Sequence, residues 1–90
     1  MSTINQLLAE RERRYGSFQR HAQISQELKG VVTHHVHDLD RRLDEDMAEA
    51  LSMICHKIAR IINGDAKYVD NWDDIAGYAT LVADRLRGES

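Results

Sequence analysis

The chain has 90 residues, of which 42% are hydrophobic and 30% charged, and its net charge is −3 with the histidines neutral. This acidic balance argues against a nucleic-acid-binding protein, which normally presents a basic face, and the absence of proline with only five glycines argues against a turn-rich β fold. The single cysteine, Cys55, excludes an intrachain disulfide. We therefore expect one all-α domain over residues 1–90, with about four helices forming a hairpin or bundle that oligomerisation completes.

The location expected from the sequence is cytoplasmic. No apolar run approaches the ~20 residues that span a bilayer, and the N-terminal segment lacks the apolar centre of a signal peptide. Cys55 lies within a helical pattern, which predicts a small buried hydrophobic residue rather than a reactive thiol.

A first helix is predicted from Ile4 to Arg13. Ser2 or Thr3 can cap its start, since a side-chain oxygen there accepts from the unpaired amides of the first turn. Gly16 suits the stop because glycine adopts a positive φ at little cost.

A second helix is predicted to start after the N-cap Ser17. Gly30 leaves its end open, and residues 33–42 are interpreted as a frayed end or a connecting loop. If residues 33–42 form a loop, the histidines in it are exposed to solvent. Adjacent helical histidines point about 100° apart, so a shared metal ion is disfavoured; the histidines concerned are His34, His35 and His37.

A third helix is predicted after the N-cap Asp44, ending at Asn63 with Gly64 in a left-handed capping conformation. Its apolar face repeats at spacings of three and four: Met47, Leu51, Ile54, Ile58 and Ile61.

A fourth helix is predicted to begin at Asp70, with Asp70 and Asp73 resembling a capping box. The stripe that we expect it to bury consists of Trp72, Ile75, Ala76, Ala79, Val82 and Leu86.

The polar edge of the last two helices is the main candidate site. Glu49, His56 and Arg60 fall close to one stripe of the third helix, with Lys57 beside it. If the helices pack antiparallel, Lys57 and Arg60 lie near the aspartates that begin the fourth helix. One interpretation is a salt-bridge network that fixes the hairpin register. The other is a ligand site in which the cations hold a phosphate and carboxylates bind a divalent ion such as Mg²⁺.

For the ligand interpretation, the predicted ligand-binding residues are Lys57, Arg60, Asp70, Asp74 and Tyr15, and the predicted metal ligands are Glu49 and Asp74. Tyr15 belongs to the segment Arg14–Phe18, whose aromatic rings either pack a helix corner or stack a base beside an arginine. The chain has no glycine-flanked nucleophile and no phosphate-binding glycine loop, which argues against kinase and dinucleotide chemistry.

Three segments together resemble a small uncharacterised domain family that is common in phage and prophage genomes: RYGSF at 14–18, EALSMICHKIARIINGD at 49–65 and DNWDDIAGYATLV at 70–82. Members are often labelled phosphofructokinase, an enzyme that a chain of this length without a phosphate loop cannot build. The resemblance implies a phage-encoded protein in the host-cell cytoplasm.

The acidic hairpin is also distantly similar to MazG-type all-α nucleotide pyrophosphohydrolases. That resemblance implies Mg²⁺ held by an E-x-x-E and an E-x-x-D pair on facing helices, and assembly as dimers or larger bundles. Asp74 falls at the last aspartate of the second pair, with Asn71 where the pair has glutamate. Asp46 and Glu49 meet the spacing of the first pair.

The function predicted from these features is binding of a nucleotide-like or phosphorylated small molecule, by sequestration or with Mg²⁺-dependent hydrolysis, in a homo-oligomer without membrane or nucleic-acid partners. The alternatives are a protein-interaction module, such as an inhibitor of a host enzyme, and a structural oligomer with no ligand.

Overall fold

The computed structural model describes residues 3–89, and these residues form four α-helices and no strand. The helices are α1 (Thr3–Tyr15), α2 (Phe18–Asp38), α3 (Glu45–Asn63) and α4 (Val69–Glu89). The all-α prediction is confirmed. Ser2, one of the two predicted caps of the first helix, lies outside the described residues.

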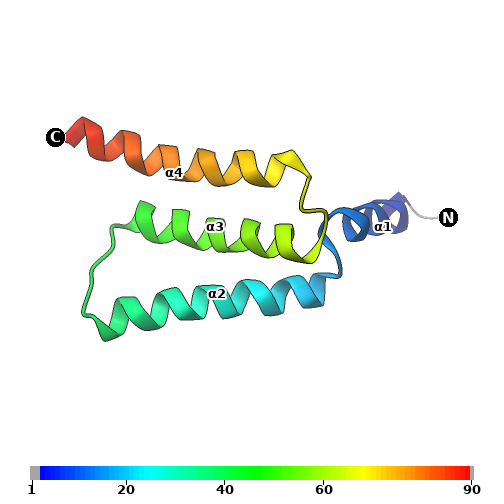
Figure 1. Ribbon diagram of the computed structural model, residues 1–90, viewed down its shortest axis with the longest axis horizontal. Helices are drawn as coiled ribbons and strands as arrows, with labels where there is room; N and C mark the ends of the chain where they lie inside the picture. The colour runs from blue at the N-terminus through cyan, green and yellow to red at the C-terminus, as the bar shows by residue number, and fades with distance from the viewer. Residues whose placement is uncertain (1–2, 90) are drawn as a thin grey trace.

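Helices α2, α3 and α4 lie side by side with α3 in the middle, and α1 projects beyond them at the end where α2 begins (Figure 1). Successive helices of the three run antiparallel. α3 packs against α2 and α4, whereas α2 and α4 make no packing contact within the described residues. The three helices therefore form a single layer rather than a closed bundle.

The first interhelical corner agrees with the sequence. Gly16 has φ +76°, and the Ser17 hydroxyl accepts a hydrogen bond from the Arg20 amide at 3.3 Å. α2 then continues through Gly30 to Asp38. Of the two interpretations of residues 33–42, the connecting loop is therefore wrong for the first six residues, which form the end of the helix. A single glycine costs a helix only about 1 kcal/mol, which the packing of α2 on α3 can outweigh.

The start of α3 is where Asp44 predicts it, but Asp44 makes no side-chain capping bond. Its carboxylate instead accepts from Arg85 of α4 at 2.8 Å. Arg85 also donates to Asp46 at 2.5 and 2.7 Å, and this hydrogen bonding lowers the pKa of the Asp46 carboxyl. The pairing ties the end of α4 to the start of α3.

The predicted left-handed conformation of Gly64 is wrong, since its φ is −126°. The glycine is needed for a different reason: a Cβ there would collide with the backbone of Arg14 and Tyr15. The segment that leaves α3 thus passes directly against the end of α1, and the Asp65 amide donates to the Arg14 carbonyl at 2.6 Å.

α4 begins at Val69, so Asp70 lies in its first turn rather than at its N-cap. The predicted buried stripe is wrong for four of its six residues. Ile75 and Val82 are half-buried, whereas the other four are exposed: Trp72, Ala76, Ala79 and Leu86. Polar anchors set this rotation, because Asn71 is 1% exposed and Arg85 is held by the acids near the start of α3.

The hydrophobic core is small. Among the apolar residues described, only three small ones are buried: Ala50, Cys55 and Ala59. The predicted burial of Cys55 is confirmed at 7% exposure. Twelve large apolar side chains, by contrast, are exposed, so much of the apolar surface of the described residues faces away from the rest of the chain.

The two glycines Gly16 and Gly30 provide a matched test of this fold. Gly16→Ala is expected to lower the free energy of unfolding by about 2 kcal/mol or more, because φ is positive and the added Cβ would overlap the Asn63 carbonyl. Gly30→Ala is expected to raise it by about 0.5–1 kcal/mol, since the site is helical and no other atom lies within 4 Å of the added Cβ. Urea unfolding followed by circular dichroism measures both, and a destabilising Gly30→Ala would contradict the continuous α2.

Candidate functional site

The predicted site residues separate into two groups. Lys57 of α3 pairs with Asp74 of α4, with 2.8 Å between Nζ and Oδ2. Arg60 lies over the ring of Tyr15, with 4.2 Å from the guanidinium carbon to the ring centroid. The antiparallel hairpin therefore brings the predicted cation and carboxylate together, while Arg60 turns toward α1.

The Lys57–Asp74 pair has a structural geometry. Lys57 is only 8% exposed, and the Asp74 side chain is 46% exposed. A buried ammonium group needs a charged partner to offset its lost hydration, and Asp74 supplies one. This agrees with the interpretation in which the pair fixes the register of α3 and α4.

The arginine and tyrosine belong to a cavity of about 210 Å³ at the junction of α1, α2 and α3. We call it the Tyr15 cavity, and its lining residues are Leu8, Arg11, Glu12, Tyr15, Gly16, Phe18, His21, His56 and Arg60. Three helices and two aromatic side chains thus surround a space with two arginines at its wall.

The local backbone positions Tyr15 firmly. The Asn63 side-chain amide donates to the carbonyls of Tyr15 and Ser17 at 2.8 and 2.9 Å. Since Asn63 ends α3, these bonds fix the α1–α2 corner against the end of α3. The ring of Tyr15 is therefore held in place beside Arg60 by main-chain contacts.

Asp70 joins this group through Tyr68. The rings of Tyr15 and Tyr68 meet edge to face at 6.1 Å, and the Tyr68 hydroxyl donates to Asp70 at 2.8 Å. Arg14 donates to the same hydroxyl at 2.7 Å. The hydrogen bond to Asp70 raises the pKa of Tyr68. Asp70 therefore supports the aromatic wall and is not itself a lining residue of the cavity.

A histidine pair forms another wall of the Tyr15 cavity. Nε2 of His21 and Nδ1 of His56 lie 3.2 Å apart, and His21 is only 5% exposed. Burial lowers the pKa of both rings, with Arg60 as the next cause, and the pKa of His56 falls to about 4. Both histidines are therefore neutral near pH 7.

The tautomers of this pair follow from the buried atom that has no partner. Within residues 3–89, Nδ1 of His21 is buried without a hydrogen-bond partner. A bare lone pair is less costly to bury than an unpaired N–H, so we assign the shared proton to Nε2 of His21. His56 then carries its own proton on Nε2. The pair thus offers a neutral N–H donor next to two guanidinium groups.

The sequence predicted some of these residues and missed others. His56 lies on the predicted polar stripe, and Tyr15 and Phe18 lie in the predicted aromatic segment. His21, Arg11 and Tyr68 were missed. Their partners are distant in sequence, 35 residues away for His21 and 54 for the Arg14–Tyr68 contact, so no spacing within one helix could indicate them.

The predicted metal ligands do not come together into a ligand set. Glu49 is exposed on α3, and Asp74 is engaged by Lys57. In the described part of the chain, no three histidine, cysteine, aspartate or glutamate side chains are grouped so as to hold a metal ion. His34, His35 and His37 are exposed on α2 instead of lying in a loop.

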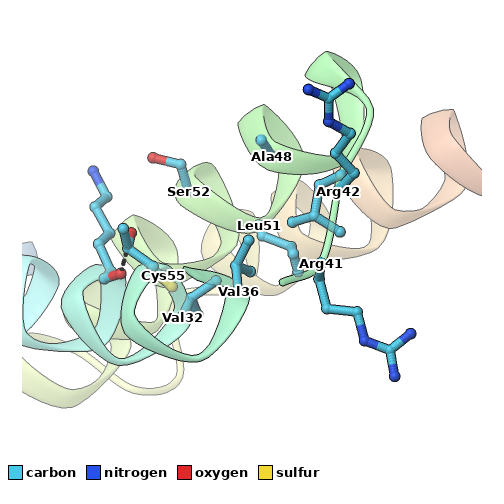
Figure 2. Close-up of a pocket in the computed structure, with 11 residues that line it drawn as sticks. Val32, Val36, Arg41, Arg42, Ala48, Leu51, Ser52 and Cys55 are labelled. Carbon is cyan, nitrogen blue, oxygen red and sulfur yellow. Dashed lines mark hydrogen bonds between the residues drawn. The ribbon is translucent and has the colours of Figure 1, made fainter. Parts of the chain in front are cut away.

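A larger cavity, about 420 Å³, lies at the other end of the layer between α2 and α3. It exists because the α3 side chains Ala48, Ser52 and Cys55 are small (Figure 2). Figure 2 shows Arg41 and Arg42 extending in opposite directions away from its apolar side chains. None of the predicted site residues lines it, and its walls offer few polar groups to orient a ligand.

Comparison with known families found one match, a family described as "Domain of unknown function (DUF6378)", over residues 1–86. The match covers nearly the whole chain, and the chain belongs to this family. No curated protein and no solved structure matches it. Between residues 3 and 89, none of the helices combines the length and the apolar character needed to cross a lipid bilayer.

The structural role of the ion pair can be tested by neutralising one partner. Asp74→Asn is expected to lower the free energy of unfolding by about 1–3 kcal/mol, because the buried Lys57 ammonium would lose its charged partner. Asp73→Asn, at an exposed neighbouring position, is the control and should change it by less than about 0.5 kcal/mol. Chemical denaturation at pH 7 measures both variants. Equal effects would contradict the assigned role of Asp74.

The histidine pair predicts a pH dependence of stability. Below the ordinary pKa of 6.5 the unfolded chain protonates His56, whereas the folded chain does so only near its pKa of about 4. Stability is therefore complete above pH 6.5 and falls as the pH drops toward 4, by roughly 1–2 kcal/mol from this group after allowance for solvent screening. His56→Gln should flatten that slope in denaturation curves, and the exposed His37→Gln should leave it unchanged. An unaltered slope in His56→Gln would exclude this group as the cause.

Proposed function

We propose that this DUF6378 protein binds a nucleotide-like or otherwise phosphorylated small molecule in the Tyr15 cavity. The observation that supports the proposal is the convergence of Arg60, Tyr15 and the His21–His56 pair on one open cavity. Aromatic rings supply a π face on which a planar base can stack. Guanidinium groups bind phosphate oxygens in a bidentate manner.

Each wall of the cavity is complementary to a different part of such a ligand. Arg11 and Arg60 face the phosphate, and the Nε2–H of His56 donates to an oxygen of the ligand. Phe18 is 80% exposed and lies where a base can cover it. At about 210 Å³ the cavity holds a ring rather than a whole dinucleotide, since pockets for drug-sized ligands usually measure about 300–1,000 Å³.

This arrangement favours binding over hydrolysis. Mg²⁺-dependent phosphoryl chemistry needs carboxylates that can share a metal ion beside the phosphate. Near the Tyr15 cavity the only lining carboxylate is Glu12 among the described residues, and Asp74 is paired with Lys57. We therefore place sequestration ahead of hydrolysis.

The wider setting of the protein also stays a proposal. Its resemblance to phage and prophage proteins and to MazG-type pyrophosphohydrolases suggests a phage accessory protein in the host-cell cytoplasm, acting on a nucleotide-like metabolite. We further propose that it acts as a homo-oligomer, because its single layer of helices leaves many large apolar side chains exposed.

The alternative of a protein-interaction module is favoured by a different feature. α1 buries none of its residues, and its apolar side chains Ile4, Leu7 and Leu8 are 64%, 52% and 57% exposed. A helix that projects in this way can dock on a host protein. Its contribution of four residues to the Tyr15 cavity is equally well explained by ligand binding.

Ligand binding can be tested by thermal shift and calorimetry with nucleoside mono- and triphosphates at millimolar concentration, with and without Mg²⁺. Binding is expected, and Arg60→Gln should weaken it at least about tenfold through loss of a charge-assisted contact. Arg41→Gln is the matched control, because it removes the same charge from the opposite end of the layer and should leave the affinity unchanged.

Two results would contradict the proposal. One is the absence of a shift with every nucleotide. The other is equal weakening by Arg60→Gln and Arg41→Gln, which would indicate nonspecific attraction by net charge. Release of inorganic phosphate or pyrophosphate in the Mg²⁺ samples would overturn the preference for sequestration.

A further inference from the structure

One broad side of the helical layer is apolar. On α3, a rotation of about 100° per residue places all charged residues within a single arc of roughly 120°. The residues that face α4 and those that face α2 lie on nearly opposite sides of the helix. Between them, on the side away from the charges, remains a stripe that neither neighbour covers completely: Met47, Leu51, Ile54, Ile58 and Ile62.

The neighbouring helices extend this stripe on the same side of the layer. When each helix is turned so that its half-buried residues face α3, α2 contributes Ile24, Leu28 and Val31, with Arg20 and His35 on the same side. α4 contributes Trp72, Ala76, Ala79, Ala83 and Leu86. We call the thirteen apolar residues the apolar face. Val31, Ile62 and Trp72, one from each helix, are 59%, 64% and 54% exposed.

The exposed area of the whole chain, the projecting helix α1 included, is larger than that of a compact monomer. A compact monomer of 10.3 kDa exposes about 5,400 Å² by the usual scaling with mass, whereas this chain exposes 6910 Å². The excess is about 1,500 Å². If two copies each covered that area, the interface would bury about 3,000 Å², which lies in the range of obligate homodimers.

We propose that the apolar face is a two-fold interface on which a second copy of this chain packs its own apolar face. Domains normally consist of at least two layers around one core, and the second copy supplies the layer that a single chain lacks. A two-fold arrangement also makes the same patch complementary to itself. This inference rests on the proposed homo-oligomer and identifies its surface.

The geometry keeps the interface separate from the ligand site. His56 and Arg60 occupy the charged arc of α3, on the side opposite to the apolar stripe. The Tyr15 cavity therefore opens away from the second copy. Loss of the interface should leave the cavity residues in place, so the two proposals can fail independently.

Light scattering after size-exclusion chromatography tests the interface at about 50 µM protein. The full chain is expected at twice its mass of 10.3 kDa. Ile62→Glu and Val31→Glu each place a charge in the interface and are expected to weaken the dimer at least about a hundredfold. Leu81→Glu is the matched control: Leu81 is 69% exposed on the opposite side of α4, and this variant should stay dimeric.

Each outcome decides a different point. A monomeric wild-type chain would overturn the homo-oligomer itself. A wild-type oligomer that both interface variants preserve, or that Leu81→Glu disrupts equally, would overturn the assignment of the surface. An oligomer larger than a dimer would overturn the simple two-fold pairing.

The glutamate variants can lose their helices along with the dimer, which circular dichroism would reveal. In that case Ile62→Ala, which removes apolar area without adding charge, is measured by dilution. A dimer dissociation constant raised about tenfold or more supports the interface. An unchanged constant overturns it.

Discussion

Helix α3 is the central packing element of this domain, because it alone of the four described helices contacts each of the other three. Its side toward α2 is lined with small residues, which allow close approach and also leave a cavity at one end. Its side toward α4 holds Lys57, whose buried ammonium requires Asp74. The register of the hairpin, the corner at Tyr15 and the position of Arg60 all follow from how this one helix is held.

Polar contacts fix the positions of the other helices more than apolar burial does. Arg85 ties α4 to the start of α3, and Asn63 ties the α1–α2 corner to its end. With only three buried apolar side chains among residues 3–89, the fold has little hydrophobic driving force to specify orientation. Directional hydrogen bonds provide the specificity here, and much apolar surface stays exposed.

The sequence predicts the helices of this protein better than their rotation. Ser17, Asp44 and Asn63–Gly64 mark helix ends correctly, although Ser17 alone of these makes the expected side-chain capping hydrogen bond. Gly30 does not end the second helix, because the free energy that one glycine costs is small compared with the packing of a 21-residue helix.

The rotation of α4 could not be predicted for a different reason. That helix has two stripes with apolar residues, and periodicity alone does not say which one faces α3. The polar residues Asn71 and Arg85 decide it, and their partners lie on another helix.

The sequence predicted one part of the candidate site and missed another part. The Lys57–Asp74 pair follows from two helical stripes that meet in an antiparallel hairpin, so the sequence contains it. The grouping of Tyr15 with Arg60 and His21 depends on where α1 turns back against the end of α3. That turn depends on a backbone contact between Gly64 and Arg14, which no pattern of side chains encodes.

Because α2 and α4 do not contact each other, the layer resembles a short linear array in which each helix packs only against its neighbours. Energetic communication between the two outer helices has to pass through α3. Opening of α4 can therefore precede that of the α2–α3 pair, as a separate cooperative unit in hydrogen exchange. Neighbour-only coupling of this kind also favours rapid folding, since the contacts form between helices adjacent in the sequence.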